Sequence, residues 1–235
     1  MSPLQRSSDP RAITGCSPLT NWVIRSGVSA ARARVVIAED HTLVREGMGQ
    51  LLAAEFEVVG LVEDGRSLVQ AAESLQPDLV LLDISMPQLN GLEAARQVVR
   101  ASPHTRLIFV TIHSDAAYVQ AAFAAGAHGY VVKSEAASGL IAAMHEVLAG
   151  RRHVSKGLEL GDDGVSSAPE PLSARQREIL QLVAEGQTAR AIGGLLGISH
   201  KTVEFHKAAI MRVLGMHTTA ELTRYALERG IIVVS

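Results

Sequence analysis

Short runs of apolar residues alternate with longer stretches of helical periodicity between residues 34 and 150. The apolar runs lie at residues 35–38, 57–62, 79–82, 107–110 and 129–132. The stretches between and after them have the apolar spacing of helices, at residues 41–54, 66–75, 91–101, 115–125 and 138–150. Uninterrupted apolar runs are typical of parallel strands that are covered on both faces. The pattern therefore predicts an α/β fold with a doubly wound, five-stranded parallel sheet.

A different pattern begins at Leu172. Ser173, Thr188 and Ser199 each precede a helix-spaced apolar set, as N-cap residues do, and Gly186 and Gly197 separate the sets. Two short helices across a glycine turn favour a helix-turn-helix, whose second helix enters the major groove of DNA. The outward positions of that helix are Lys201, Thr202, Glu204, Lys207, Ala208 and Arg212. A small all-α bundle with solvated charges fits this pattern equally well.

Glycine occurs twice inside the first helix of this predicted motif, at Gly193 and Gly194. A glycine in a helix interior costs about 1 kcal/mol relative to alanine, because it loses more backbone entropy on folding. We expect Gly193→Ala to raise the melting temperature if the position has room for a methyl group.

Two segments follow neither pattern. Residues 151–171 are rich in Gly, Ser and Pro, and we assign them to a linker. Residues 1–33 have no sustained period, and we assign them to a disordered N-terminal extension. A start codon assigned too far upstream would also explain these residues, because the strand and helix pattern of the first domain does not require any residue before Ala33. A targeting peptide is disfavoured by the lack of an apolar core segment.

Charge divides the chain into an acidic and a basic part. Residues 34–150 carry 7 Lys and Arg against 14 Asp and Glu, a net charge of −7, whereas residues 172–235 carry 8 against 5, a net charge of +3. A basic second domain suggests a nucleic-acid partner. The single cysteine, Cys16, cannot form an intramolecular disulfide and fits a reducing compartment. No apolar run reaches membrane-helix length, so we expect a cytoplasmic protein with no membrane association.

Polar residues follow four of the predicted strands at the point where each ends. Asp83 follows residues 79–82, Glu39 and Asp40 follow the first strand, and Thr111 and Lys133 follow the fourth and fifth. One aspartate in such a place is usually a turn or cap residue. Ligands of open α/β sheets, however, bind outside the carboxyl ends of the strands. Three carboxylates, a hydroxyl and an ammonium at this edge suit a divalent cation together with an anionic oxygen group.

These residues, with Met86, Pro87 and Gly91 after Asp83 and Gly129 before Tyr130, resemble the receiver domain of two-component response regulators, of flavodoxin-like fold. The resemblance covers residues 34–150. It implies that Asp83 accepts a phosphoryl group from a cognate histidine kinase. It further implies that Thr111 and Lys133 contact the phosphoryl oxygens, and that Tyr130 is a switch aromatic that turns inward after phosphorylation. The implied Mg²⁺ ligands are Glu39, Asp40, Asp83 and the main-chain carbonyl of Ser85.

Residues 172–235 resemble the helix-turn-helix of the NarL/FixJ (LuxR-type) regulators. The matching positions are Arg175, Glu178, Leu180, Gly186, Ile192, Leu196, Ile198, Ser199, Thr202, Val203, His206, Ile210 and Leu214. The resemblance implies sequence-specific DNA binding as a homodimer when the protein is phosphorylated, with the helix Thr219–Glu228 in dimerisation. The residues expected at the DNA are Lys201, Thr202, Glu204, Phe205, His206, Lys207, Ala208 and Arg212.

The leading hypothesis is a phosphorylation-switched transcription factor that is not an enzyme. A phosphotransfer module with a catalytic output is one alternative, but residues 172–235 contain no further carboxylate pair or nucleophile motif. A second alternative is a degenerate regulator that binds DNA constitutively. The chain argues against it, because it retains the complete set of Asp40, Asp83, Thr111 and Lys133. The acidic receiver could shield the basic recognition helix before phosphorylation; equally, its acidity could reflect only solubility and a metal site.

Overall fold

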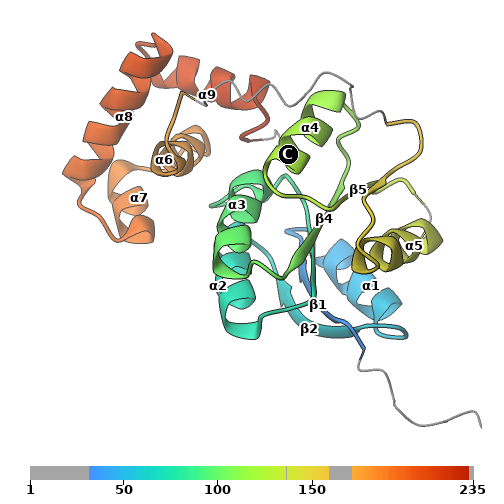
Figure 1. The fold of residues 1–235 in the computed structure, drawn as a ribbon. Coiled ribbons are helices and arrows are strands. Elements are labelled where there is room, and N and C mark those ends of the chain that lie inside the picture. The colour runs from blue at the N-terminus through green and yellow to red at the C-terminus, as the bar shows by residue number, and fades with distance from the viewer. Residues whose placement is uncertain (1–31, 136, 159–170, 233–235) are drawn as a thin grey trace, which may run out of the picture. The chain divides into compact units, whose positions relative to one another are not determined.

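The computed structural model describes residues 32–135, 137–158 and 171–232 (Figure 1). Most of the assigned N-terminal extension, and residues 159–170 of the assigned linker, lie outside the described residues. The chain from Arg32 onward forms one compact unit.

The receiver is a parallel sheet with the strand order β2-β1-β3-β4-β5-β6. Its strands are β1 (Arg34–Ala38), β2 (Glu57–Val62), β3 (Leu79–Leu82), β4 (Arg106–Thr111), β5 (Gly129–Val132) and β6 (His153–Val154). The chain runs from β1 outward to β2 and then returns to place β3 on the other side of β1. The carboxyl ends of β1 and β3 therefore meet where the winding direction reverses, which is where doubly wound sheets bind ligands.

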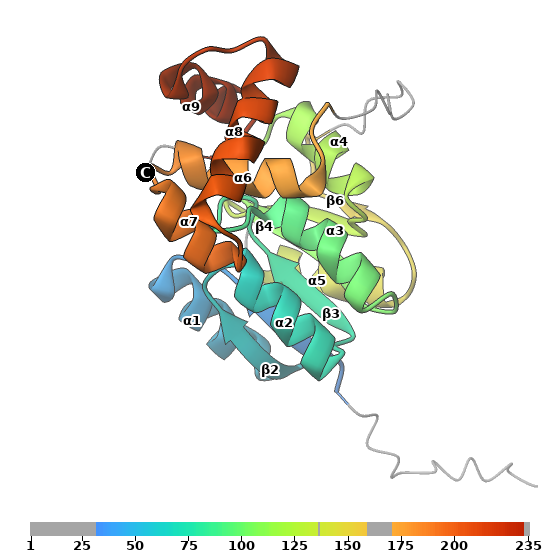
Figure 2. The same ribbon diagram turned by 90° about the vertical axis from the view of Figure 1, so that its left-hand side faces the viewer.

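Helices cover both faces of this sheet (Figure 2). One apolar core joins it to α2 (Gly65–Leu75), α3 (Gly91–Ala101) and α4 (Ala116–Ala124). The other core joins it to α1 (Thr42–Leu52) and α5 (Ala137–Leu148). All four residues of β3 are fully buried, which explains why that run is apolar at every position. The doubly wound fold expected from the sequence is confirmed.

The sixth strand was not expected. His153 and Val154 pair in parallel with Gly129 and Tyr130 of β5. Ser155 continues this contact, since its amide donates to the Tyr130 carbonyl (2.9 Å) and its Oγ accepts from the Val132 amide (2.9 Å). The sheet therefore has one strand more than the five expected, and this strand lies within the segment assigned to the linker. A strand of two residues is too short to produce a periodic pattern.

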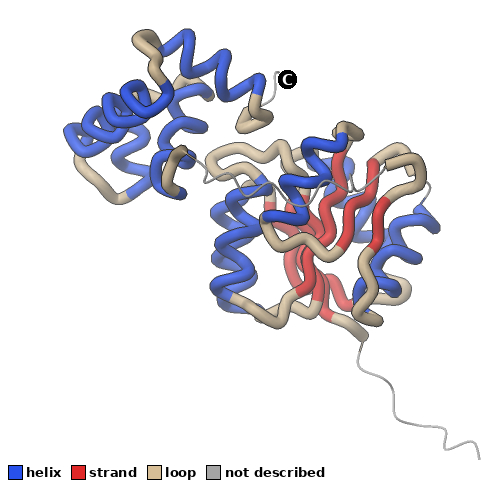
Figure 3. The backbone as a smooth tube through the Cα atoms, turned by 45° about the horizontal axis from the view of Figure 1, so that its top comes forward, coloured by secondary structure: helices blue, strands red, loops and turns tan. Residues whose placement is uncertain are grey.

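The described chain after residue 170 consists of helices and turns (Figure 3). The helices are α6 (Ala174–Ala184), α7 (Ala189–Leu196), α8 (His200–Leu214) and α9 (Thr219–Glu228). Ser173, Thr188 and Ser199 cap the first three as expected, each accepting a hydrogen bond from an amide of the first turn. Gly197 adopts the left-handed conformation (φ 64°) that the turn between α7 and α8 requires.

The expectation for Gly193 is not supported by the structure. Gly193 is buried in α7, and its carbonyl accepts a hydrogen bond from the Ile198 amide (3.0 Å). An added Cβ would lie 2.7 Å from the Ile198 carbonyl oxygen, because the turn folds back against the helix at this residue. The position has no room for a methyl group, whereas an added Cβ at Gly194 would meet nothing within 4 Å.

Candidate functional site

An ion-paired carboxylate site lies at the carboxyl edge of the sheet. Glu39 follows β1, Asp83 follows β3 and Lys133 follows β5. The Lys133 Nζ lies 2.6 Å from Asp83 Oδ2 and 2.6 Å from Glu39 Oε2. The carboxylate side chains are 1% (Glu39) and 3% (Asp83) exposed, and that of Lys133 is 16% exposed. One ammonium is therefore paired with two buried carboxylates that follow different strands.

Lys133 remains charged in this environment. Burial alone lowers the pKa of a lysine, because it disfavours the ammonium. The charges of Asp83 and Glu39, and the hydrogen bonds they accept, outweigh that effect and raise the pKa of Lys133 above its ordinary value. The site thus contains a permanent positive charge at the Asp83 carboxylate.

The Asp83 carboxylate is oriented by the loop that follows it. Its Oδ1 accepts from the Ile84 amide (2.6 Å) and from the Ser85 amide (3.4 Å). The loop is fixed at its far end, where the Gly91 amide donates to the Ile84 carbonyl (2.9 Å). A Cβ at Gly91 would collide with the Asp83 carbonyl oxygen, so only glycine allows this close approach. The other carboxylate oxygen, Oδ2, faces Lys133.

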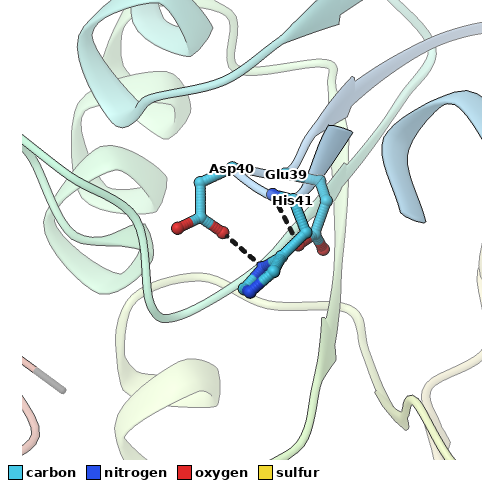
Figure 4. A group of neighbouring side chains, drawn as sticks. All are labelled: Glu39, Asp40 and His41. Carbon is cyan, nitrogen blue, oxygen red and sulfur yellow. Dashed lines mark hydrogen bonds and ion pairs between the residues drawn. The ribbon is translucent and has the colours of Figure 1, made fainter. Parts of the chain in front are cut away.

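Figure 4 shows a second group of polar side chains, formed by Glu39, Asp40 and His41. Their potential ligand atoms lie within 4.8 Å of one another. The His41 Nδ1 is 3.0 Å from Glu39 Oε1 and 2.9 Å from Asp40 Oδ1. The hydrogen bond to Glu39 and the charge of Asp40 raise the pKa of His41. The paired carboxylates are oxygen donors of the kind that hard cations take, so they fit the expected Mg²⁺. Asp83 is not part of this group.

Thr111 and Tyr130 both lie close to this edge and are fully buried. The Thr111 carbonyl accepts from the Lys133 amide (2.8 Å), and the Tyr130 hydroxyl donates to the His113 carbonyl (2.9 Å). Burial, and then the charge of Asp83, raise the pKa of Tyr130. The ring of Tyr130 already lies inward in this structure, so it does not have to turn to reach the interior.

Two residues near the site were missed by the sequence analysis. His41 directly follows the acidic pair, and His113 follows Thr111 by two residues. The His113 Nε2 lies 3.0 Å from Ser85 Oγ. Their closeness to predicted site residues was the only available indication, since a histidine in a loop has no periodic pattern.

The second candidate site is the outer face of α8. Glu204, Ala208, Lys201 and Arg212 are exposed, and Thr202, His206 and Lys207 are partly exposed. Phe205 is 71% exposed, which is unusual for a large apolar side chain and typical of a binding surface. Val203 and Ile210 are fully buried on the opposite face, as expected. The residues predicted to contact DNA therefore share one accessible surface.

Helix α6 contacts the loop that follows Asp83, through a residue that the sequence analysis did not identify. Gln181 is 1% exposed. Its Oε1 accepts from the Asn90 amide (2.7 Å), and its Nε2 donates to the Met86 carbonyl (3.0 Å). Arg177 of the same helix forms an ion pair with Glu93 (2.7 Å). These contacts involve α6 and not the recognition helix, so shielding of α8 by the receiver stays a prediction.

Comparisons with known proteins match both parts of the chain. The family model described as "Response regulator receiver domain" matches residues 35–145, and that of "Bacterial regulatory proteins, luxR family" matches residues 170–226. The transcriptional regulatory protein DegU of Brevibacillus brevis is 32% identical over 231 residues, covering 88% of this chain and 98% of the relative. The oxygen regulatory protein NreC of Staphylococcus epidermidis is 34% identical over 215 residues, covering 85% of this chain and 99% of the relative.

Two solved structures are similar as well. A LuxR-family two-component response regulator from an Aurantimonas species is 33% identical, with a TM-score of 0.53 over 55% of this chain and 93% of that one. RcsB from Salmonella enterica serovar Typhimurium, solved bound to a promoter in the presence of the phosphomimetic BeF3-, is 27% identical. Its TM-score is 0.52, over 83% of this chain and 97% of that one.

A parallel α/β receiver with carboxylates gathered at the carboxyl edge of its sheet, followed by a helix-turn-helix, defines a transcriptional regulator that depends on phosphorylation. The chain belongs to the LuxR-type (NarL/FixJ) family of two-component response regulators. In the part of the chain that the structure describes, no helix has the length and apolar character needed to cross a membrane.

Proposed function

We propose that Asp83 is the residue that accepts a phosphoryl group from a histidine kinase, and that its phosphorylation switches DNA binding through α8. The observation that supports this most directly is the ion pair between Lys133 Nζ and Asp83 Oδ2, 2.6 Å apart, at the switch point of the sheet. A carboxylate held beside a permanent positive charge is suited to receive an anionic group.

The chemistry requires little covalent help from the protein. A carboxylate oxygen of Asp83 forms a bond to phosphorus while the bond between phosphorus and the donor histidine nitrogen breaks. Positioning and neutralisation of charge supply most of the catalysis in such a transfer. The Ile84 amide orients the acceptor carboxylate. Lys133, which lies 2.6 Å from Asp83 Oδ2, and Thr111 would contact the phosphoryl oxygens.

Magnesium would bind at the same edge of the sheet. Glu39, Asp40, Asp83 and the main-chain carbonyl of Ser85 would hold Mg²⁺, which when bound neutralises negative charge on the phosphoryl oxygens. Asp40 is exposed, so the metal ion would enter this ligand set from solvent at Asp40.

The output of the switch is a dimer on DNA. Lys201, Lys207 and Arg212 would contact phosphates, whereas Glu204 and Phe205 would reach base edges in the major groove. Helix α9 would form the dimer contact, and paired half-sites would be the target. Support comes from the accessible face of α8 and from the similarity to RcsB, which has been solved on a promoter. Because such a regulator acts on DNA, we propose a cytoplasmic location.

The test uses a small phosphodonor with Mg²⁺ and intact-mass spectrometry. We expect an adduct of about 80 dalton, one phosphoryl group in place of a proton, on the full chain. Asp83→Asn should abolish it, and Asp40→Ala should abolish its Mg²⁺-dependent formation while leaving the fold intact. The matched control is Asp78→Asn, because Asp78 is an exposed aspartate at the opposite end of β3. An adduct that persists in Asp83→Asn would refute the assignment.

The same sample tests the dimer. Light scattering on the phosphorylated protein should give twice the mass of the unphosphorylated protein, and Asp83→Asn should stay monomeric. If the phosphorylated and the unphosphorylated protein bound DNA with equal affinity, that result would instead support the alternative of constitutive DNA binding.

A further inference from the structure

Helix α1 and strand β2 form the two walls of an open groove on the receiver. The groove has a volume of about 490 Å³, and its lining residues are Glu46, Gly49, Gln50, Ala53, Val58, Val59, Gly60 and Leu61. Apart from Glu46 and Gln50 this lining is apolar or glycine, and Leu61 is 46% exposed within it. Contiguous apolar surface of this kind, rimmed by polar side chains, marks an interaction site.

Strand β2 is also an edge of the sheet. In the part of the chain that the structure describes, it pairs with β1 and ends the strand order β2-β1-β3-β4-β5-β6. An edge strand presents unpaired amide and carbonyl groups on its outer side, and proteins commonly cover such an edge to prevent pairing with another chain. A segment in the groove would lie against this edge.

The described chain begins at one end of the groove. The Arg32 Nη1 donates to the carbonyl of Ala53, which is one of the lining residues (3.0 Å). The Glu57 amide, at the start of β2, donates to the Ala33 carbonyl (3.0 Å). Residues 1–31, which lie outside the described residues, are therefore attached to the receiver where the groove begins.

The sequence before Arg32 contains one run of three large apolar residues, at residues 22–24 (Trp22, Val23 and Ile24). The ten residues from the start of this run to Arg32 reach at most about 33–36 Å when extended. The groove follows α1 from Ala53 to Glu46, which is about 10 Å of helix. The apolar run can therefore reach every part of the groove.

Charge favours the same occupant. Residues 1–31 carry three arginines against one acidic residue, and Arg25 directly follows the apolar run. Glu46 in the groove and Glu57 at the start of β2 are both exposed. Opposite charges at the surface attract one another only over short distances in salt, so this attraction acts once the segment lies beside the groove.

We propose that residues 22–24 of this chain dock in the groove between α1 and β2 and cover the exposed Leu61 and the edge of β2. For these three residues, the proposal replaces the disorder expected from the sequence. It is independent of phosphorylation. It also concerns a segment that lies outside the match to the receiver family, which begins at residue 35.

The experiment uses Trp22, which is the only tryptophan of the chain. Indole emission moves to shorter wavelength away from water, so the full-length protein should emit at shorter wavelength than the urea-unfolded protein at every protein concentration. Leu61→Lys and Gln50→Lys each place a cation in the groove, and each should return the emission to that of the unfolded protein. Leu43→Lys is the matched control, because Leu43 is 86% exposed on α1 and does not line the groove.

Circular dichroism identifies the variants that fold, and the two groove variants lie on different elements, so one suffices if the other fails. Wild-type emission at the wavelength of the unfolded protein would overturn the proposal. Emission that stays at short wavelength in a folded groove variant would overturn it too, because Trp22 would then be buried elsewhere. A shift that appears only as the protein concentration rises would assign the groove to a second copy of the chain. Loss of the shift in Leu43→Lys would reveal a general effect of charge, and both of these results also contradict the proposal.

Discussion

Lys133 and Asp83 form an ion pair at the carboxyl edge of the sheet, with Nζ 2.6 Å from Oδ2. The same Nζ lies 2.6 Å from Glu39 Oε2, so one cation lies between two of the carboxylates expected to bind Mg²⁺. A bound metal ion and this ammonium repel one another and share the same carboxylate charge.

Lys133→Met should therefore bind Mg²⁺ more tightly than the wild type. Loss of the ammonium leaves two buried carboxylates without their cation, and we expect an affinity gain of about tenfold, which corresponds to about 1.4 kcal/mol. Calorimetric titration at fixed ionic strength measures it. Lys156→Met, which removes an exposed lysine, should leave the affinity unchanged. Equal affinity in both variants would show that the ammonium does not oppose the metal.

Gly91→Ala should damage the acceptor loop. The added Cβ would meet the Asp83 carbonyl oxygen, so the loop must shift, at a cost of about 1–3 kcal/mol in the free energy of unfolding. Formation of the phosphoryl adduct should slow as well. Urea denaturation and intact-mass spectrometry measure the two effects. Gly47→Ala in α1 is the control, since its Cβ would meet nothing within 4 Å. A fully stable Gly91→Ala variant would contradict this geometry.

Substitutions at the neighbouring glycines of α7 should have opposite effects. Gly194→Ala should stabilise the DNA-binding domain by about 0.5–1 kcal/mol, because the site is open and alanine loses less backbone entropy. Gly193→Ala should lower its stability, because the Cβ would lie 2.7 Å from the Ile198 carbonyl oxygen. Thermal denaturation of both variants decides the matter. A higher melting temperature for Gly193→Ala would show that the turn yields easily.

Tyr130 should ionise only at a pH well above 10. Burial and the Asp83 charge raise its pKa in the folded state, so its contribution to stability is present below pH about 10, its unfolded value, and is lost as the pH rises through the folded value. Burial also raises the pKa of Tyr118, so tyrosinate absorbance should show late contributions from both Tyr118 and Tyr130. Tyr130→Phe should remove the contribution of Tyr130 and retain that of Tyr118. An early, reversible titration of Tyr130 would contradict its burial.

The Gln181 contact should protect one amide of the acceptor loop. The Asn90 amide donates to Gln181 Oε1 (2.7 Å), so Gln181→Ala should speed hydrogen exchange at Asn90. Gln187→Ala, which changes an exposed glutamine in the turn after α6, should have no effect. If Asn90 exchanged equally fast in the wild type and in Gln181→Ala, α6 would not hold this loop in solution.

The sequence by itself determined the elements and the composition of the acceptor edge. Runs such as residues 79–82 are apolar at every position because both faces of the strand are covered, and Ser173, Thr188 and Ser199 lie where helix amides need partners. The ordered set Asp40, Asp83, Thr111 and Lys133 was readable because strand ends of a parallel sheet share one edge.

Only the tertiary structure decided which of these groups contact one another. The bridge from Lys133 to both Glu39 and Asp83, the contact between Ser85 and His113, and the short strand β6 all join residues far apart in the chain. The lack of space at Gly193 depends on how the turn at Ile198 folds back. Periodicity and caps record the local surroundings of each residue, whereas these contacts depend on how the strands, helices and loops pack together, and that packing leaves no local pattern in the sequence.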